Sequence, residues 1–234
     1  MIFSNIKSMT RFVWISSKKR GFIYSLRIAL AELSFEIKYQ IDTISIRPID
    51  HIADVSAADK ENAVHYQGSY VWVVKKMLAK LADHTNNRGT FIDLGSGKGR
   101  VMMQAGLQGY QNIIGVEFSN ALNQICEENL AAFKKKSRCS SQFTTVTRNV
   151  MVYDIPTETS VVYLGNPFGA AIMLKVLEQI EDSLKKQPRE IFIAYFNPLN
   201  SDLLLQHGYH VIMVEKDPSG AVIFQAFKKA VTAK

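Results

Sequence analysis

Residues 91–100, with the sequence FIDLGSGKGR, could bind a nucleotide-like ligand. An apolar run leads to Asp93, and glycines then occupy alternate positions. Glycines at a turn from a strand into a helix let the backbone approach a ligand closely and leave free N–H groups at the helix start. The alternative is a tight connection that binds nothing. If the loop binds a ligand, we expect contacts from Asp93, Gly95, Ser96, Gly97, Gly99 and Arg100.

Two common phosphate-binding motifs do not match this loop. A P-loop requires Ser or Thr after its lysine, whereas Gly99 follows Lys98. The dinucleotide fingerprint GxGxxG requires its third glycine at position 100, where the chain has Arg100. The spacing therefore excludes a P-loop and disfavours an NAD(P)-dependent oxidoreductase, which we keep as an alternative.

A second acid, Glu117, ends the next apolar run along the chain. A carboxylate at the tip of a second strand can accept two hydrogen bonds from ribose hydroxyls. Taken alone, Glu117 could also be a surface acid near the start of the following helix. Because it follows the glycine loop, we predict that Glu117 and the adjacent Phe118 bind the ligand.

An Asn-Pro pair follows each of two later apolar runs, at Asn166-Pro167-Phe168 and at Asn197-Pro198. Ligands of open α/β sheets bind at the carboxyl ends of the strands, so we expect Asn166 and Asn197 to face one crevice. The alternative is that Asn-Pro begins a turn and Phe168 packs in the core.

Apolar runs rich in β-forming residues alternate with helical patterns from Thr90 onward, which predicts a parallel sheet covered by helices on both faces. The expected strands are 90–94, 112–117, 143–148, 160–165, 190–195, 209–215 and 221–227. The expected helices are 22–39, 69–84, 98–108, 120–135, 170–185 and 200–207. The link between the last two strands is too short for a helix, so they must form an antiparallel hairpin. The fold class is thus a doubly wound α/β fold with a seven-stranded, mostly parallel sheet and an N-terminal helical arm.

The positive charge is concentrated at the N-terminus. The whole chain has a formal net charge of +7, and residues 1–30 contain six Lys or Arg and no acid. We expect residues 1–59 to form a basic, aromatic helical arm and residues 60–234 to form the main domain. The arm's composition suits an anionic membrane surface or an acidic partner. An organelle-targeting segment, or a helix that packs its apolar face (Leu26, Leu30, Leu33 and Ile37) on the domain, are the alternatives.

The remaining composition narrows the class of protein. The chain has 234 residues, of which 47% are hydrophobic and 21% charged, as in ordinary globular domains. Its two cysteines lack a CxxC spacing and its five histidines show no metal-ligand spacing, so we expect neither disulfides nor a metal. We expect a cytoplasmic protein, peripheral to a membrane if the arm binds lipid.

Over residues 60–228 this pattern resembles the class I S-adenosylmethionine-dependent methyltransferase superfamily. The resemblance implies that Asp93, in the Asp-x-Gly-x-Gly-x-Gly motif, helps to hold the cationic methionine end of S-adenosyl-L-methionine. Many members have an acid for the adenine amino group after the third strand. This chain has Asn149 there, whose side-chain oxygen can accept the same hydrogen bond. We assign Tyr66, before the domain core, to closing over the methionine end.

The resemblance also suggests a catalytic corner at Asn166, Pro167 and Phe168. These residues resemble the Asn/Asp-Pro-Pro-Tyr/Phe motif of amino-directed methyltransferases, shortened by one proline. In such a corner two oxygen acceptors hold an –NH₂ group while the aromatic ring covers it. We therefore expect methyl transfer to nitrogen on a protein side chain, a nucleobase or a small amine. The alternative is a non-catalytic binding module that keeps the cofactor fold and acts through its basic arm.

Overall fold

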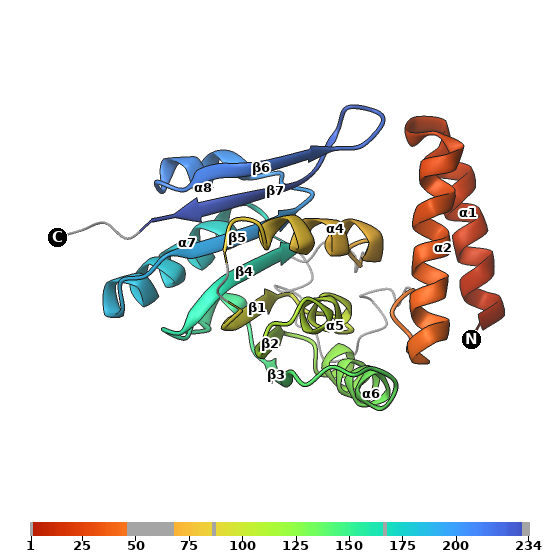
Figure 1. Ribbon diagram of the computed structural model, residues 1–234. Helices are drawn as coiled ribbons and strands as arrows, with labels where there is room; N and C mark the ends of the chain where they lie inside the picture. Colours follow the sequence, from red (N-terminus) through yellow and green to blue (C-terminus); the bar gives the residue numbers. More distant parts are fainter. Residues whose placement is uncertain (1, 46–67, 86–87, 166–167, 231–234) are drawn as a thin grey trace.

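A seven-stranded sheet forms the centre of the molecule (Figure 1). The structure is a computed structural model that describes residues 2–45, 68–85, 88–165 and 168–230. The strand order is β3-β2-β1-β4-β5-β7-β6, and the first five strands in this order are parallel. The strands are β1 (Thr90–Leu94), β2 (Asn112–Glu117), β3 (Gln142–Thr147), β4 (Thr159–Gly165), β5 (Ile191–Phe196), β6 (His210–Lys216) and β7 (Val222–Lys229). The predicted fold class is confirmed.

Helices cover both faces of the sheet. They are α1 (Ile2–Arg20), α2 (Phe22–Tyr39), α4 (Val71–Leu81), α5 (Arg100–Leu107), α6 (Asn120–Lys136), the short 3₁₀ helix η2 (Val150–Val152), α7 (Ala170–Lys186) and α8 (Ser201–Gln206). One face packs against α4, α5 and α6 and the other against α7 and α8 (Figure 1). Because both faces are covered, strands such as β1 and β5 are buried at every position. This explains the continuous apolar runs in the sequence.

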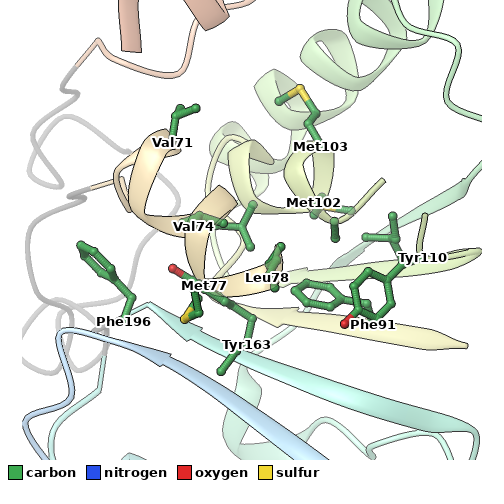
Figure 2. Packing of buried hydrophobic residues seen from close by; sticks show 14 of the residues in the cluster. Val71, Val74, Met77, Leu78, Phe91, Met102, Met103, Tyr110, Tyr163 and Phe196 are labelled. Carbon is green, nitrogen blue, oxygen red and sulfur yellow. The ribbon is translucent and has the colours of Figure 1, made fainter. Parts of the chain in front are cut away.

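Helix α4 contributes to the core on one face of the sheet. Its Met77 and Leu78 side chains lie on the sheet side of the helix, near Tyr163 of β4 and Phe91 of β1 (Figure 2). Met77 is fully buried, and Tyr70, just before the helix, packs edge-on against Phe196 with ring centroids 5.7 Å apart. The start of α4 is therefore fixed beside the carboxyl ends of the central strands.

The last two strands form the predicted antiparallel hairpin, but β7 lies between β5 and β6. The turn between them is organised by Asp217, whose Oδ1 accepts hydrogen bonds from the backbone N–H groups of Ser219 and Ala221 at 2.9 and 3.2 Å. Gly220 has φ +87°, a conformation that glycine adopts without strain. A short loop therefore turns the chain back into the sheet.

The arm is an antiparallel pair of helices, α1 and α2, which lies beyond the strand ends beside α4 (Figure 1). Asn5 of α1 donates to Glu36 of α2 at 2.6 Å, and Ser25 of α2 donates to Ser16 of α1 at 2.9 Å. Glu36 also accepts hydrogen bonds from the backbone N–H groups of Thr43 and Ile44, both at 2.5 Å. Polar contacts thus join the two helices to each other and to the segment that follows.

The expected apolar face of α2 does not pack on the domain. Leu26, Leu30 and Ile37 lie on the exposed side, and Leu30 and Ile37 are 57% and 59% accessible. The buried side of α2 instead carries Glu32 and other small, polar or aromatic residues. The alternative in which this stripe packs on the domain is therefore not what the structure shows, because polar contacts hold α2 in place.

The start of α4 differs from the sequence prediction. The helix expected over residues 69–84 begins two residues later, at Val71, and has no side-chain cap from its preceding residue. Glu32 of α2 provides the cap, since its Oε1 accepts the Val71 N–H at 2.6 Å. A long-range contact thus satisfies a helix-terminal donor that a local side chain usually satisfies.

Candidate cofactor and methyl-transfer site

The glycine loop lies between β1 and α5 at the switch point of the sheet, where β2 leaves on one side of β1 and β4 on the other. This is where ligands bind in open α/β folds. Gly95, Gly97 and Gly99 have φ values of +81°, +51° and +82°. A residue with a Cβ would be strained at each of these positions, which explains why the loop alternates glycine with other residues.

The loop's N–H groups are mostly bonded within the protein, contrary to the expectation that they remain free for a ligand. Those of Gly95 and Ser96 donate to Val116 O of β2 at 2.8 and 3.1 Å. The Gly97 N–H donates to Glu117 Oε2 at 3.0 Å, and the Gly99 N–H donates to Ser96 O at 2.9 Å. The loop is therefore held in shape before any ligand binds.

Asp93 is the carboxylate just before this loop, and it is 2% accessible. Burial, and then the nearby Glu117, raise the pKa of Asp93 to about 8. Among the described residues, no hydrogen bond to its carboxyl group is found. A cationic group placed beside this buried carboxyl group would favour its ionised form. The assignment of the cationic methionine end to Asp93 requires such a contact.

Glu117 at the end of β2 is 4% accessible and braces the glycine loop. Its Oε2 accepts the Gly97 N–H, and its Oε1 accepts the Ser119 N–H at 3.0 Å. The same carboxylate thus orders the loop and the start of α6. A carboxylate at this position is suited to ribose hydroxyls, since each of its oxygens can accept more than one hydrogen bond.

Ser96 adds a feature that fits a ligand, and Gly115 packs closely against it. The Ser96 Oγ is buried and has no hydrogen-bond partner among the described atoms, so a polar ligand group could satisfy it. A Cβ on Gly115, in the neighbouring β2, would lie 2.8 Å from that Oγ. The sequence interpretation overlooked Gly115 because it lies inside an ordinary apolar strand run.

Two basic residues of the loop point away from this site. Arg100, expected in the cofactor site, is an ion-pair partner of Glu32 and donates to Thr43 Oγ1 at 3.0 Å and to Ser69 O at 3.1 Å. Lys98 is completely buried, and its Nζ donates to Ser45 O at 2.8 Å. Both side chains therefore attach the domain to the arm and its following segment, which corrects the role expected for Arg100.

Three further residues were expected to contact the cofactor, and the structure describes two of them. The Asn149 Oδ1, expected to accept from adenine, accepts the Met151 N–H at 2.9 Å and so caps η2. Phe118, next to Glu117, is partly buried. Tyr66 lies outside the described residues.

The expected acceptor corner follows β4. Asn166 and Pro167 lie outside the described residues. Phe168 is partly buried against the core on the α7 side, and its carbonyl oxygen accepts from the Asn200 side chain at 3.1 Å. Asn197, at the end of β5, has φ +49° and donates its N–H to Ile223 O at 2.8 Å.

The sequence interpretation missed the residues that bring α4 to this corner. A Cβ on Gly165, the last residue of β4, would lie 3.1 Å from Ser69 Oγ and 3.2 Å from the Tyr163 ring. Tyr163 pairs in register with Asp93 across β4 and β1, and burial raises the pKa of its hydroxyl. Gly165 was the available signal, because a glycine ending a buried strand often marks a close approach.

A cavity of about 310 Å³ lies between the arm and the domain. Its walls include Phe12 and Ile15 of α1, Ile28 of α2, and Tyr70 and Arg100 of the domain. Among the described residues no cluster of His, Cys, Asp or Glu could hold a metal ion.

Comparison with solved structures shows the fold. A tRNA (uracil-54, C5)-methyltransferase from Pyrococcus abyssi, solved with S-adenosyl-L-homocysteine, matches with a TM-score of 0.50 and 10% identity. The match covers 70% of this chain and 39% of that one. The PH0226 protein from Pyrococcus horikoshii OT3 matches with a TM-score of 0.50 and 13% identity, over 69% of this chain and 90% of that one. No curated protein matches the sequence.

A protein-family comparison identifies the family. Residues 60–208 match the family described as histone methylation protein DOT1. The matched segment contains the glycine loop, Asp93, Glu117 and the residues around Asn166. The resemblance to the class I methyltransferases is confirmed, and their S-adenosyl-L-methionine is the cofactor that the buried acids and the unpartnered Ser96 hydroxyl fit. Because the match covers more than half of the chain, this protein belongs to the DOT1 histone methylation family.

Proposed function

We propose that the protein transfers the methyl group of S-adenosyl-L-methionine to a nitrogen atom of its acceptor. The observation that carries the proposal is the pair of buried acids, Asp93 and Glu117, on either side of a glycine loop at the switch point of the sheet. A chain of the DOT1 family with this arrangement is equipped to bind the cofactor.

The protein's own residues contribute binding and orientation. Bound S-adenosyl-L-methionine supplies an activated methyl group on a sulfonium. Asp93 would hold the cationic methionine end, and Glu117 would accept hydrogen bonds from the ribose. Since Glu117 also fixes Gly97, the loop and the ribose contact are set by one carboxylate. Positioning of this kind supplies most of the acceleration that a displacement at an activated carbon needs.

Nitrogen is favoured by the residue types that follow β4. Asn166 comes directly after Gly165, and an amide oxygen and a proline carbonyl are acceptors for the N–H donors of an amine. In the transfer, the nitrogen lone pair forms the new bond to the methyl carbon while the carbon–sulfur bond breaks, and the nitrogen then loses a proton to water. The family is named for histone methylation, so a protein side chain is one acceptor that this proposal includes.

Cofactor binding and transfer can be tested separately. Calorimetry should show that S-adenosyl-L-homocysteine binds and that NAD does not. Glu117→Gln should weaken binding, because it removes a charged acceptor and loosens Gly97, while Glu178→Gln on the exposed side of α7 should not. Equal binding of NAD would contradict the cofactor assignment.

The acceptor requires a methyl-labelled cofactor and a fractionated lysate. We expect label in protein, nucleic acid or small amines, on nitrogen, and Asn166→Ala should slow transfer by about 10²-fold or more. Label on oxygen, sulfur or carbon would contradict the nitrogen proposal. Cofactor binding without transfer to any fraction would favour the alternative of a non-catalytic binding module.

A further inference from the structure

The exposed charges of the α1–α2 pair are all of one sign. Among its described residues, the exposed charged side chains are Lys7, Arg11, Lys18, Lys19, Arg27 and Lys38. The two acids of the pair, Glu32 and Glu36, are 2% and 6% accessible and are used in internal contacts. The seventh cation, Arg20, pairs with Asp217 at 2.6 Å. The outside of the pair therefore offers positive charge without compensating acids.

The same surface is unusually apolar. Of the 15 exposed large hydrophobic side chains in the described chain, eight lie on α1 and α2. They are Ile6, Trp14, Ile15, Phe22, Ile23, Leu26, Leu30 and Ile37. Trp14 is 70% and Ile23 76% accessible. Large apolar side chains that are exposed together in this way mark a surface that binds a partner. We call these eight residues and the six exposed cations the hairpin surface.

The hairpin surface is ordered along each helix. On α1, the exposed Lys7, Arg11, Trp14 and Lys18 recur about one turn apart, and the Lys18 Nζ lies 5.5 Å from the Trp14 ring centroid. On α2, Ile23, Leu26, Leu30 and Ile37 form an apolar stripe at helical spacing, away from the buried contacts of that helix. One helix therefore exposes a largely cationic stripe and its neighbour exposes an apolar stripe.

We propose that the hairpin surface binds the surface of an anionic lipid bilayer. Apolar side chains with Trp and Phe enter the boundary between headgroups and acyl chains, and Lys and Arg attract anionic headgroups. Within the described residues no helix has the length and hydropathy needed to cross a bilayer. The proposal therefore places the α1–α2 pair on the bilayer surface. A second copy of this chain is a poor occupant, because face-to-face packing would oppose cations with cations.

Contacts with the domain hold the α1–α2 pair so that it presents this surface in one orientation. Glu32 bridges to Val71 and Arg100, and Arg20 reaches Asp217 in the turn between β6 and β7. Binding to a bilayer would thus place the carboxyl ends of the strands at a fixed height above the lipid.

Vesicle co-sedimentation of the full chain tests the proposal, and needs neither cofactor nor acceptor. We expect binding to vesicles of phosphatidylcholine mixed with phosphatidylglycerol, little binding to phosphatidylcholine alone, and weaker binding as salt rises. Because no methyl transfer is measured, failure here leaves the proposed function untouched.

Matched variants separate the hairpin surface from general stickiness. Lys18→Gln with Lys19→Gln should lower partitioning by about tenfold or more, whereas Lys135→Gln with Lys136→Gln, exposed on α6, should change it little. Ile23→Ser with Leu30→Ser should also release the protein, and Leu199→Ser with Leu205→Ser should not.

Three results would overturn the proposal. The first is a folded full chain that ignores anionic vesicles. The second is equal loss of binding in the α6 lysine variants. The third is a dimer in light scattering that Ile23→Ser with Leu30→Ser dissociates while vesicle binding persists, which would assign the surface to a second copy.

Discussion

At the scale of single residues, the site depends on two acids with different surroundings. Glu117 accepts two backbone N–H groups, whereas Asp93 has only burial and a neighbouring negative charge around it. Motif spacing predicted both acids as cofactor contacts, and the structure buries both beside the glycine loop. It could not show that Arg100 turns toward Glu32, because that partner lies far away in the chain and only the folded structure brings the two together.

The raised pKa of Asp93 predicts a pH effect on binding and stability. Because a bound cation favours the ionised carboxyl group, affinity for S-adenosyl-L-homocysteine should rise with pH up to about 8. The folded protein holds a proton that the unfolded chain releases above about 4, so stability should fall by up to ~1.4 kcal/mol per pH unit between those values. Asp93→Asn should bind weakly at every pH and lose this slope. Calorimetry and thermal unfolding at about pH 5 and about pH 7.5, both inside that window, would check it.

Gly115 offers a second prediction at this scale. In Gly115→Ala the new methyl group would meet Ser96 Oγ at 2.8 Å and Met102 Cε at 2.9 Å. We expect a loss of about 1–3 kcal/mol in stability and weaker cofactor binding, because the shifted Ser96 belongs to the glycine loop. Gly169→Ala, which has open space around it, is the control for stability by denaturant unfolding. Equal effects of the two variants would contradict this account.

At the scale of elements, sequence patterns located the helices and strands well but not the direction in which α2 faces. Every expected strand is present within about two residues, because buried parallel strands leave continuous apolar runs. Inward packing of the apolar stripe of α2 was one of the alternatives left open, and the structure places Leu30 outward and Glu32 inward. Periodicity shows that a helix has two faces, but burying a carboxylate depends on distant partners such as Arg100 and Val71.

Glu32 gives the element-scale prediction. Glu32→Gln keeps a possible acceptor for the Val71 N–H but leaves the buried Arg100 guanidinium without its charged partner. We expect about 3 kcal/mol or more of destabilisation. The same substitution in the exposed Lys175–Glu178 pair, 2.6 Å apart, should cost less than about 1 kcal/mol. Urea unfolding of both variants tests the contrast. Equally small losses of stability would show that the buried pair is not needed for the stability of the fold.

At the scale of the whole molecule, the sequence predicted a parallel sheet with a terminal hairpin, but not how the arm is attached. The attachment uses pairs such as Arg20–Asp217, which join the first helix to the last turn. No local pattern marks such a pair, because Arg and Asp residues are common in the sequence and their partners are set by the assembled fold. The cofactor loop was more predictable, since its glycines and acids lie within a short stretch of sequence.

The Arg20–Asp217 pair predicts a pH-dependent contribution to stability. Burial alone would raise the pKa of Asp217, but hydrogen bonds from Ser219 and Arg20 outweigh it and lower the pKa below its usual value. The contribution is therefore present at neutral pH and is lost as pH falls through the lowered pKa. Asp217→Asn should cost about 1–2 kcal/mol at neutral pH. The gap from the parent should close in acid, which thermal unfolding across pH would show, and a gap that persists there would argue against an ionic contribution.

The position of β7 has a consequence for how the chain is made. β7 follows β6 in the sequence but lies between β5 and β6 in the sheet. During synthesis, β5 therefore waits with an open hydrogen-bonding edge until residues 222–229 leave the ribosome. That edge, in the apolar Ile191–Phe196, can pair with another unfinished chain. A stop codon just before Val222 should thus yield aggregated protein rather than a smaller soluble one.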